Sequence, residues 1–292
     1  MTRHMNLNRS LRLFGLLLSG SLLLVGCNSG DSVIDGGAYT PVAVTLLVEE
    51  AAGESGGGAS EAAAGPKIES FGTFRGRVVV TGNPPSLKPL VAQGQSVNDS
   101  GVCARVPVPN ESVIVGPNNG LANVFVYLRR VPNVDVPPPT SDPLVVDQQG
   151  CKFVPHASIV RVGQPIRLLN SDAVAHNVKL AGLAMAFNQT LPAGDKEGIE
   201  ISYQRPERSP IPMNCDFHGW MLAHQLAVDH PWATLSKEDG TFVIEGVPAG
   251  EMEFVVWHEK LGAINNRLVV NVPADGETPE VEIEVNASAL GS

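Results

Sequence analysis

Three potential metal donors lie within seven residues between Cys215 and Met221. Cys215, His218 and Met221 supply a thiolate, an imidazole and a thioether at C-x-x-H-x-x-M spacing, and His176 offers a second imidazole upstream. Two imidazoles and a thiolate in one plane, with a weak axial thioether, are the ligands of mononuclear copper sites that transfer electrons. A dinuclear centre would need a second bridging thiolate, which this loop lacks. We therefore expect these four residues to hold one copper ion per chain and to leave no position for a substrate.

Each donor also has a purely structural interpretation. His176 alone fits a hydrogen-bonded core or surface histidine, and Cys215 alone fits one half of a disulfide. Met221 alone is more often a packing residue than a ligand. The shared spacing of the donors favours copper binding over these separate explanations.

The chain from residue 144 to residue 229 resembles the cupredoxin family. The run from Phe153 to Asp172 ends in N-x-D and is followed by H-N-V at residues 176–178, like the strands that deliver the first histidine ligand. The C-x-x-H-x-x-M run is similar to the amicyanin-type ligand loop. The resemblance implies a Greek-key sandwich, a type 1 copper ion on the four donors above, and Asn177 as a residue that braces the ligand loop from outside. It also places His218 at an exposed end of the site, where a redox partner would dock through a small, weak interface.

Two positions depart from the cupredoxin pattern. Met213 stands where the family usually has an aromatic residue, two before the ligand cysteine, and Ala223 stands where it usually has glycine. Neither change removes a ligand, but both bear on the geometry and reduction potential of the site.

The remaining cysteines are given separate roles. In an oxidising compartment outside the cytoplasm, a Cys103–Cys151 disulfide is the simplest arrangement. The competing arrangement is a second metal site made by these cysteines with His156. Extra imidazoles at His156, His224, His230 and His258 also leave open a second metal site built from histidines.

The N-terminus has the pattern of a targeting segment. Three arginines, at positions 3, 9 and 12, precede an apolar run at residues 13–25. The sequence Leu24-Val25-Gly26-Cys27 resembles the lipobox of bacterial lipoproteins, which implies a signal peptide at 1–27 and acylation of Cys27. An ordinary signal peptide or an uncleaved anchor are the alternatives. We expect an extracytoplasmic protein, lipid-anchored to a membrane facing the periplasm, with the outer membrane weakly favoured because neither Asn28 nor Ser29, the two residues after Cys27, is Asp.

Composition predicts an all-β chain. Residues 28–67 contain a Gly/Ala/Ser/Glu-rich stretch that predicts a flexible tether. The whole chain combines 30 glycines and 23 prolines with few aromatic residues, as is typical of short strands and turns. Strands are expected at 71–80, 112–115, 122–128, 144–147, 157–162, 165–169, 176–180, 198–203, 221–228, 241–244, 251–257, 267–272 and 281–285. The formal net charge of −10 argues against nucleic-acid binding.

The segments that flank the copper motif predict a second, small β-sandwich. The run from Asp239 to Gly250 reads D-G-x-F-x-I-x-x-x-P-x-G and predicts a hairpin, with Phe242 and Ile244 on one face of its strand. It resembles carboxypeptidase-regulatory or transthyretin-like modules, which also occur in rhamnogalacturonan lyases. We therefore predict this sandwich from residues 68–143 and 230–288, around a cupredoxin-like domain at 144–229.

These patterns predict a function without catalysis. The leading hypothesis is a membrane-anchored periplasmic copper protein that carries electrons to or from a redox protein such as a cytochrome or dehydrogenase. Copper handling is the first alternative. The second is a carbohydrate-binding or adhesion lipoprotein with a vestigial copper site. No catalytic triad, paired carboxylates or H-x-H cluster indicates an enzyme.

Overall fold

The computed structural model describes residues 66–291. The predicted signal peptide, Cys27 and the tether up to residue 65 lie outside the described residues. Within residues 66–291, no helix has both the length and the apolar character needed to cross a membrane.

The described chain is almost entirely β, as the composition predicts. The strands are β1 (Phe71–Thr81), β2 (Phe125–Leu128), β3 (Leu144–Gln148), β4 (Phe153–Val154), β5 (Ala157–Arg161), β6 (Ile166–Asn170), β7 (His176–Ala181), β8 (Ala186–Leu191), β9 (Ile199–Ile201), β10 (Ile211–Asn214), β11 (Leu222–Val228), β12 (Ala233–Leu235), β13 (Thr241–Pro248), β14 (Gly250–His258), β15 (Gly262–Val272) and β16 (Val281–Asn286). Three short helices accompany them: α1 (Ser100–Cys103), η1 (Pro117–Asn119) and η2 (Ala287–Leu290). The prediction of an all-β sandwich fold is thus confirmed.

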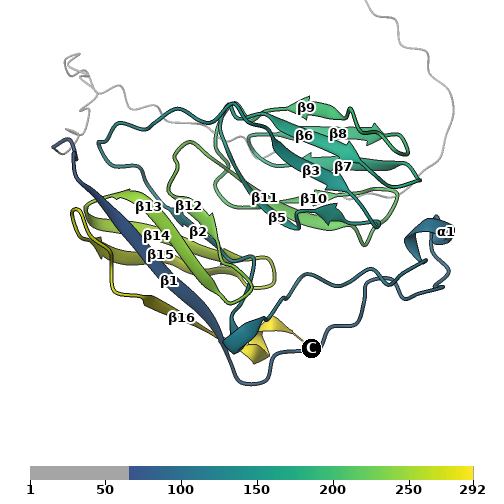
Figure 1. Cartoon of the computed structure of the whole chain (residues 1–292), viewed down its shortest axis with the longest axis horizontal. Coiled ribbons are helices and arrows are strands. Elements are labelled where there is room, and N and C mark those ends of the chain that lie inside the picture. The colour runs from purple at the N-terminus through teal and green to yellow at the C-terminus, as the bar shows by residue number, and fades with distance from the viewer. Residues whose placement is uncertain (1–65, 292) are drawn as a thin grey trace, which may run out of the picture. The chain divides into compact units, whose positions relative to one another are not determined.

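The strands form two pairs of sheets (Figure 1). The first pair has the orders β13-β1-β16 and β12-β2-β14-β15, so it combines strands from both ends of the described chain. The second pair has the orders β5-β11-β10-β7-β8 and β4-β3-β6-β9, and all its strands come from the middle. Parallel pairing of β11 with β5 and of β3 with β6 requires crossover connections, which a simple meander of hairpins would not contain.

Alternating side chains give each pair of sheets its own apolar core. Along β1 buried and less buried residues alternate, as expected when one face of a strand packs inward. Phe74 of β1 lies in the first core, with its ring centroid 5.2 Å from that of Phe242 and 4.6 Å from that of Phe254. The second core includes Phe153, Leu168, Tyr203 and the ligand candidate Cys215, so this sandwich positions the metal motif.

A third, smaller apolar cluster joins strands of the two sheet pairs. Phe125 and Tyr127 of β2 pack with Ala157 of β5 and with Leu226 and Val228 of β11. The side chains of all five are buried. Residues close to this cluster in β11 and β14 are therefore held beside each other by apolar packing.

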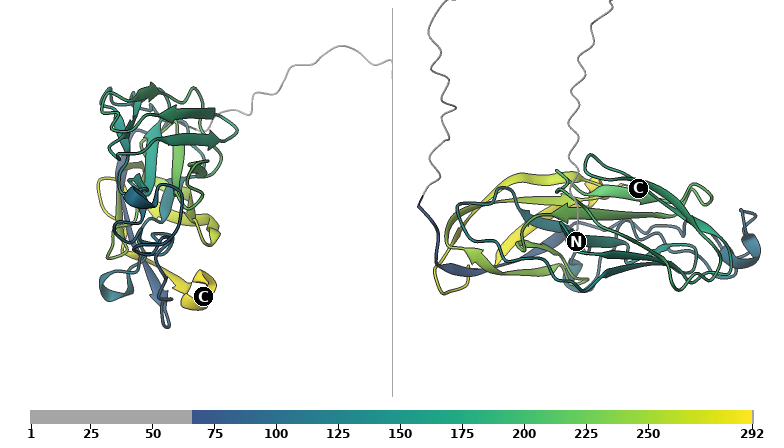
Figure 2. Two further views of the ribbon diagram at one scale, coloured as in Figure 1. Left: turned by 90° about the vertical axis from the view of Figure 1, so that its right-hand side faces the viewer. Right: turned by 90° about the horizontal axis from the view of Figure 1, so that it is seen from above.

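Residues 90–111, hereafter the covering segment, pack against the second sandwich. Val91, Cys103 and Val108 are buried in the second core, and the Val108 N–H donates to the Val91 carbonyl at 2.9 Å. Cys103 forms a disulfide with Cys151. Helix α1, which belongs to this segment, lies outside the sheets in both Figure 1 and Figure 2. A segment predicted within the flanking sandwich thus contributes to the core that surrounds the metal motif.

Several strand predictions need correction. Residues 112–115 form only an isolated bridge, Val115 with Leu121, at the predicted turn. Strands β4, β8, β10 and β12 were not predicted. Strands β4 and β12 have only two and three residues, and exposed polar residues in β8 and Pro212 in β10 hide the period-two pattern. The hairpin predicted between Asp239 and Gly250 is wrong: β13 and β14 lie in different sheets. Phe242 and Ile244 are nevertheless both buried on one face of β13, as predicted.

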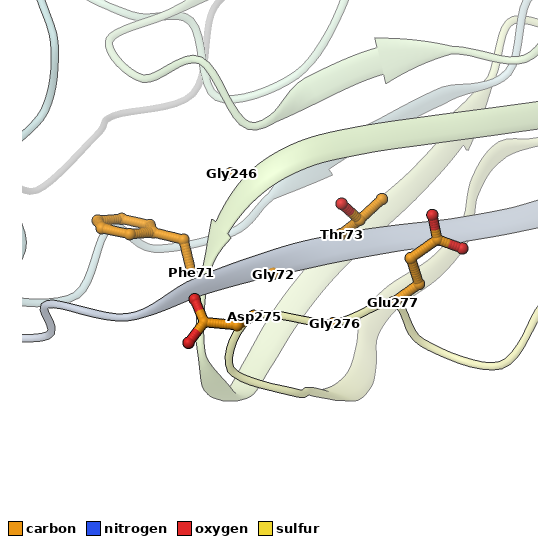
Figure 3. Close-up of a pocket in the computed structure, with 7 residues that line it drawn as sticks. All are labelled: Phe71, Gly72, Thr73, Gly246, Asp275, Gly276 and Glu277. Carbon is orange, nitrogen blue, oxygen red and sulfur yellow. The ribbon is translucent and has the colours of Figure 1, made fainter.

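A shallow pocket beside β1 is formed by close backbone approach and shows no donor cluster (Figure 3). The Thr73 N–H donates to the Gly276 carbonyl at 2.8 Å, and the Asp275 N–H donates to the Phe71 carbonyl at 2.8 Å. A Cβ at Gly72 would collide with the Pro273 carbonyl, so only glycine fits there. The carboxylates of Asp275 and Glu277 point in different directions in Figure 3, so they do not converge on one ligand position.

Candidate metal centre

The fold brings three of the four predicted donors together. His176 begins β7, Cys215 directly follows β10, and His218 lies in the loop before β11. The Nδ1 atoms of His176 and His218 are 2.9 Å apart, and the Cys215 Sγ lies 4.0 Å from the first and 3.7 Å from the second. Ligands at about 2.0 to 2.3 Å from a shared first-row metal ion lie roughly 3 to 4 Å from one another. The three donors therefore fit one ion, and all three are buried, at 0%, 2% and 0% exposure for His176, Cys215 and His218.

Pairing between strands places the ligand loop beside His176. Asn214, the residue before Cys215, pairs with Lys179 of β7 and with Leu222 of β11. The loop then closes on itself, because the Met221 N–H donates to the His218 carbonyl at 2.8 Å. The Met221 side chain is buried in the same core as Cys215. Its axial role stays a prediction.

Each imidazole has a carboxylate on the side away from the cluster. His176 Nε2 lies 2.9 Å from Asp172 Oδ2, and His218 Nε2 lies 3.0 Å from Asp99 Oδ2. A carboxylate that accepts from one ring nitrogen keeps the proton there, so the other nitrogen is free to bind a metal. Both Nδ1 atoms lie within 4.0 Å of the Cys215 Sγ, so a metal ion that displaces any Nδ1 proton could bind both imidazoles and the thiolate together.

Asp172 is itself fixed by backbone donors. The N–H groups of Gly150 and Cys151 each donate to its carboxylate at 2.7 Å. Burial alone raises the pKa of Asp172, but the hydrogen bonds from His176 and these two N–H groups outweigh burial and lower it. The carboxylate is thus ionised and able to orient His176.

Burial and hydrogen bonding shift the pKa values of all three donors. Burial lowers the pKa of His176, but hydrogen bonds with Asp172 and Cys215 more than offset this and raise it to about 9. Burial together with the neighbouring His176 charge lowers the pKa of His218. Although burial raises the pKa of the Cys215 thiol, hydrogen bonding with His176 and with backbone groups lowers it overall. A lowered thiol pKa favours the thiolate, which is the form that binds a metal ion.

Asn177 connects the ligand loop to β7 and β8. Its Oδ1 accepts from the Asp216 N–H at 2.5 Å, and its Nδ2 donates to Asn188 Oδ1 at 2.7 Å. Asp216 directly follows Cys215, so these contacts restrain the loop at its first ligand. They agree with the role that the cupredoxin resemblance implies for Asn177.

The expected exposure of His218 is wrong. Its side chain is fully buried, while the adjacent Phe217 is 44% exposed. Asp99 of the covering segment contacts the outer edge of the His218 ring, and the Asn98 side chain donates to the Phe217 carbonyl at 3.1 Å. The pattern of the ligand loop did not reveal this cover, because the segment that supplies it lies 119 residues earlier.

The remaining cysteines behave as the simplest arrangement predicts. Cys103 and Cys151 are joined in a disulfide, so a metal site using both with His156 is excluded. Cys215 is the free cysteine of the described residues.

The two departures from the family pattern face each other. Met213 of β10 pairs with Ala223 of β11, and both are buried. A large side chain therefore lies opposite a small one, and the pair fits the core without displacing Cys215. Large and small residues on facing positions conserve total volume, which cores tolerate well.

Two residues with clear roles at the site were not predicted. Asp172 was noted only as the end of the N-x-D motif, although its spacing of four residues from His176 was a local signal. Asp99 had no local signal, since only the tertiary fold brings it to His218.

Comparisons with solved structures find cupredoxins over about a third of the chain. A purple cupredoxin from Nitrosopumilus maritimus is 18% identical, with a TM-score of 0.25, over 29% of this chain and 99% of that one. Amicyanin from Paracoccus versutus is 17% identical, with a TM-score of 0.26, over 32% of this chain and 86% of that one. A copper-containing nitrite reductase from Thermus scotoductus SA-01 is 19% identical, with a TM-score of 0.26, over 34% of this chain and only 27% of that one. No protein-family model and no curated protein matches the chain.

Proposed function

We propose that the chain is a mononuclear type 1 copper protein that carries single electrons. The observation that supports this most directly is the buried cluster of His176, Cys215 and His218, whose donor atoms face one another at 2.9 to 4.0 Å. Two imidazoles and a thiolate are the in-plane donors of such sites. A bound copper ion would supply one-electron chemistry by alternating between Cu(I) and Cu(II).

The protein residues contribute rigidity and the exclusion of water. Strand pairing fixes Cys215, Asp172 fixes the His176 ring, and Asp99 fixes the His218 ring. With Met221 as the proposed axial ligand, four protein groups fill the site and leave no place for a substrate. The proposed role is therefore electron transfer rather than catalysis.

We place this activity at a membrane surface. The lipobox-like sequence before Cys27 supports a lipid anchor facing the periplasm, and residues 28–67 would serve as the tether. Forty residues of a Gly-rich coil have a root-mean-square reach of about 35 Å, enough for the folded part to find a partner. That partner would be a periplasmic redox protein such as a cytochrome or dehydrogenase.

One observation favours a second candidate, copper handling. The Asp99 carboxylate covers the imidazole edge through which a redox partner would be expected to exchange electrons. The electron self-exchange rate distinguishes the two roles. Fast exchange with the covering segment in place supports electron transfer, whereas slow exchange combined with copper release to a chelator supports handling.

The visible spectrum of the purified full chain with one equivalent of Cu(II) tests the proposal. We expect an intense thiolate-to-copper absorption band that is lost in Cys215→Ser. As a matched control, Glu200→Gln alters an exposed residue outside the cluster and should leave the band unchanged. A folded wild-type protein that shows no band, or a band that persists in Cys215→Ser, would overturn the proposal.

A further inference from the structure

A second group of metal donors lies where the two pairs of sheets meet. His156 precedes β5, His224 lies on β11, and Glu259 directly follows β14. One ligand atom from each residue lies within 4.8 Å of those of the other two. The histidines come from one sandwich and the carboxylate comes from the other. An ion bound here would connect the two.

The two histidines are held together by the backbone. The His224 N–H donates to the His156 carbonyl at 2.9 Å, and His224 pairs with Ala157 in the parallel β11–β5 ladder. The His224 ring lies 5.3 Å from that of Trp257, a neighbour of Glu259 in the chain. The imidazoles are therefore arranged before any ion arrives.

Glu259 presents one oxygen to each imidazole. Its Oε1 lies 2.9 Å from His156 Nε2, and its Oε2 lies 3.0 Å from His224 Nδ1. Burial alone raises the pKa of Glu259, but the adjacent imidazoles outweigh burial and lower it to about 2. The carboxylate is thus ionised at neutral pH.

One donor of this group lacks a hydrogen-bond partner. Among the described residues, none forms a hydrogen bond of acceptable direction with the buried His224 Nδ1, even though Glu259 is close. Buried polar atoms are nearly always satisfied by protein, water or an ion. A metal ion between His224 and Glu259 would supply the missing partner.

The group also has access from solvent. A cavity of about 140 Å³ is lined by His156, Glu259, Glu111, Lys152 and Trp220, among others. The side chains of His156, His224 and Glu259 remain 8% to 13% exposed, so an ion need not cross the core to reach them.

From these observations we propose a second metal site, formed by His156, His224 and Glu259, for a divalent transition-metal ion such as Zn²⁺. Two imidazoles and one carboxylate without a thiolate suit zinc, and a fourth position would remain for water from the cavity. This site is independent of the proposed copper centre. It would fasten the two sandwiches together.

The alternative is an ion-pair network that binds no metal. Glu111 lies on the other side of the His156 ring, with Oε2 4.0 Å from Nδ1, and is itself paired with Lys152 at 2.6 Å. Charged groups arranged in this way can stabilise one another without an ion. The two explanations differ in whether zinc binds.

Isothermal titration of Zn²⁺ into the full chain separates the sites. The wild type is expected to bind two zinc ions, because apo Cys215, His176 and His218 also accept zinc. In Cys215→Ser, one zinc should remain, with micromolar or tighter affinity. Adding His224→Ala to Cys215→Ser should weaken that binding by 100-fold or more. Glu200→Gln is the matched control, since Glu200 is exposed and forms an ion pair with Arg167, away from both clusters. It should change nothing.

Two results would overturn the proposal. One is a zinc dissociation constant above about 100 µM for Cys215→Ser, and the other is unchanged zinc affinity when His224→Ala is added to it. Because His224→Ala also alters packing beside Trp257, thermal unfolding must show that the variant folds. His156→Asn and Glu259→Gln are milder changes that provide the same test. Zinc should also raise the melting temperature of Cys215→Ser, and each of these substitutions should remove that rise.

Discussion

The two histidine clusters of this chain differ in burial, donor set and support. His176, Cys215 and His218 are almost completely buried and combine two imidazoles with a thiolate, on β7 and on the loop between β10 and β11 of one sandwich. His156, His224 and Glu259 are partly exposed and use a carboxylate from the other sandwich. Soft thiolate donors in a closed site suit copper and electron transfer, whereas imidazole and carboxylate donors beside a cavity suit a water-accessible zinc ion. Under the two proposals, the same residue type would contribute to two different chemistries, according to its neighbours.

The covering segment contributes to both clusters. It places Asp99 on His218 of the first cluster and Glu111 near His156 of the second. Trp220 lies between the clusters: its ring is 5.0 Å from that of His218, and it also lines the cavity of the second cluster. The first cluster depends more on this segment, since Asp99 closes it while Glu111 only borders the second.

Removal of the Cys103–Cys151 disulfide should have the largest effect. The bond closes a loop with a sequence separation of 48 residues, which corresponds to about 4 kcal/mol of unfolding free energy in the chain-entropy model. We expect the Cys103→Ser/Cys151→Ser double variant to lose that amount in urea unfolding. Copper should also leave the first cluster faster, because the Cys151 N–H donates to Asp172 and the segment carries Asp99.

A matched control is the wild type under non-reducing conditions at the same urea concentrations. A loss below about 1 kcal/mol would mean that packing of Val91 and Val108, rather than the disulfide, holds the covering segment. Unchanged copper release would contradict the dependence of the first cluster on this segment.

The sequence predicted the metal donors of the first cluster better than Asp99, the residue that covers His218. C-x-x-H-x-x-M spacing placed Cys215 and His218 on one turn, and the period-two pattern at 176–180 placed His176 on a strand. Local patterns are readable because the contacts they describe lie within a few residues. The Asp99–His218 contact spans 119 residues and the His156–Glu259 contact of the second cluster spans 103, which no local pattern encodes.

Strands were predicted where apolar residues alternate without interruption, and they were missed where the strand is short, exposed or, as in β10, interrupted by a proline. Strand β13 shows buried Phe242 and Ile244 at alternate positions, so its pattern is plain. Strand β8 is largely exposed, and its polar residues resemble a loop. The predicted hairpin between β13 and β14 is not formed, because the same turn residues also occur where a chain passes from one sheet to another. The choice of sheet depends on partners distant in the chain.

His230 is a buried histidine outside both clusters. Its hydrogen bonds are made with backbone groups, whereas the clustered histidines contact carboxylates. His230 Nε2 lies 3.1 Å from the Leu128 carbonyl, and the Trp232 N–H donates to His230 Nδ1 at 3.2 Å. Burial lowers the pKa of His230 to about 4; the nearby Asp229 carboxylate opposes this shift and Arg161 adds to it.

The folded pKa of His230 lies below the unfolded value of about 6.5, so the unfolded chain takes up the proton first. Its contribution to stability is complete above pH 6.5 and is lost as the pH falls toward 4. The loss is about 3 kcal/mol, to order of magnitude, at 1.36 kcal/mol per pKa unit. Urea unfolding at several pH values measures it.

His230→Asn is the comparison for this measurement, because asparagine can keep one donor and one acceptor but does not titrate. The difference in stability between wild type and variant should change between pH 6.5 and 4 and stay constant above pH 7. Subtraction removes the contributions of other buried histidines, such as His258. A difference that does not vary with pH would show that His230 accepts a proton in the folded state as easily as in the unfolded one.

The smallest expected effect compares the two carboxylates behind the first cluster. The Asp172 side chain is 9% exposed and its carboxylate accepts hydrogen bonds from three groups. The Asp99 side chain is 48% exposed, and its carboxylate contacts His218. Loss of an outer carboxylate typically lowers metal affinity 10- to 100-fold. We expect Asp172→Asn to fall within that range and Asp99→Asn to weaken copper binding less than about 10-fold, since water can replace an exposed carboxylate more readily than a buried one.

Competition of copper between each variant and a chelator measures both affinities. The two substitutions are isosteric and remove the same charge, so each serves as the control for the other. Thermal unfolding of the apoproteins separates a folding defect from a weaker site. Equal losses would mean that orientation of the imidazole matters more than burial of the carboxylate. A larger loss in Asp99→Asn would make the covering segment the main support of the copper site, because its contact with His218 would then outweigh the buried hydrogen bonds behind His176.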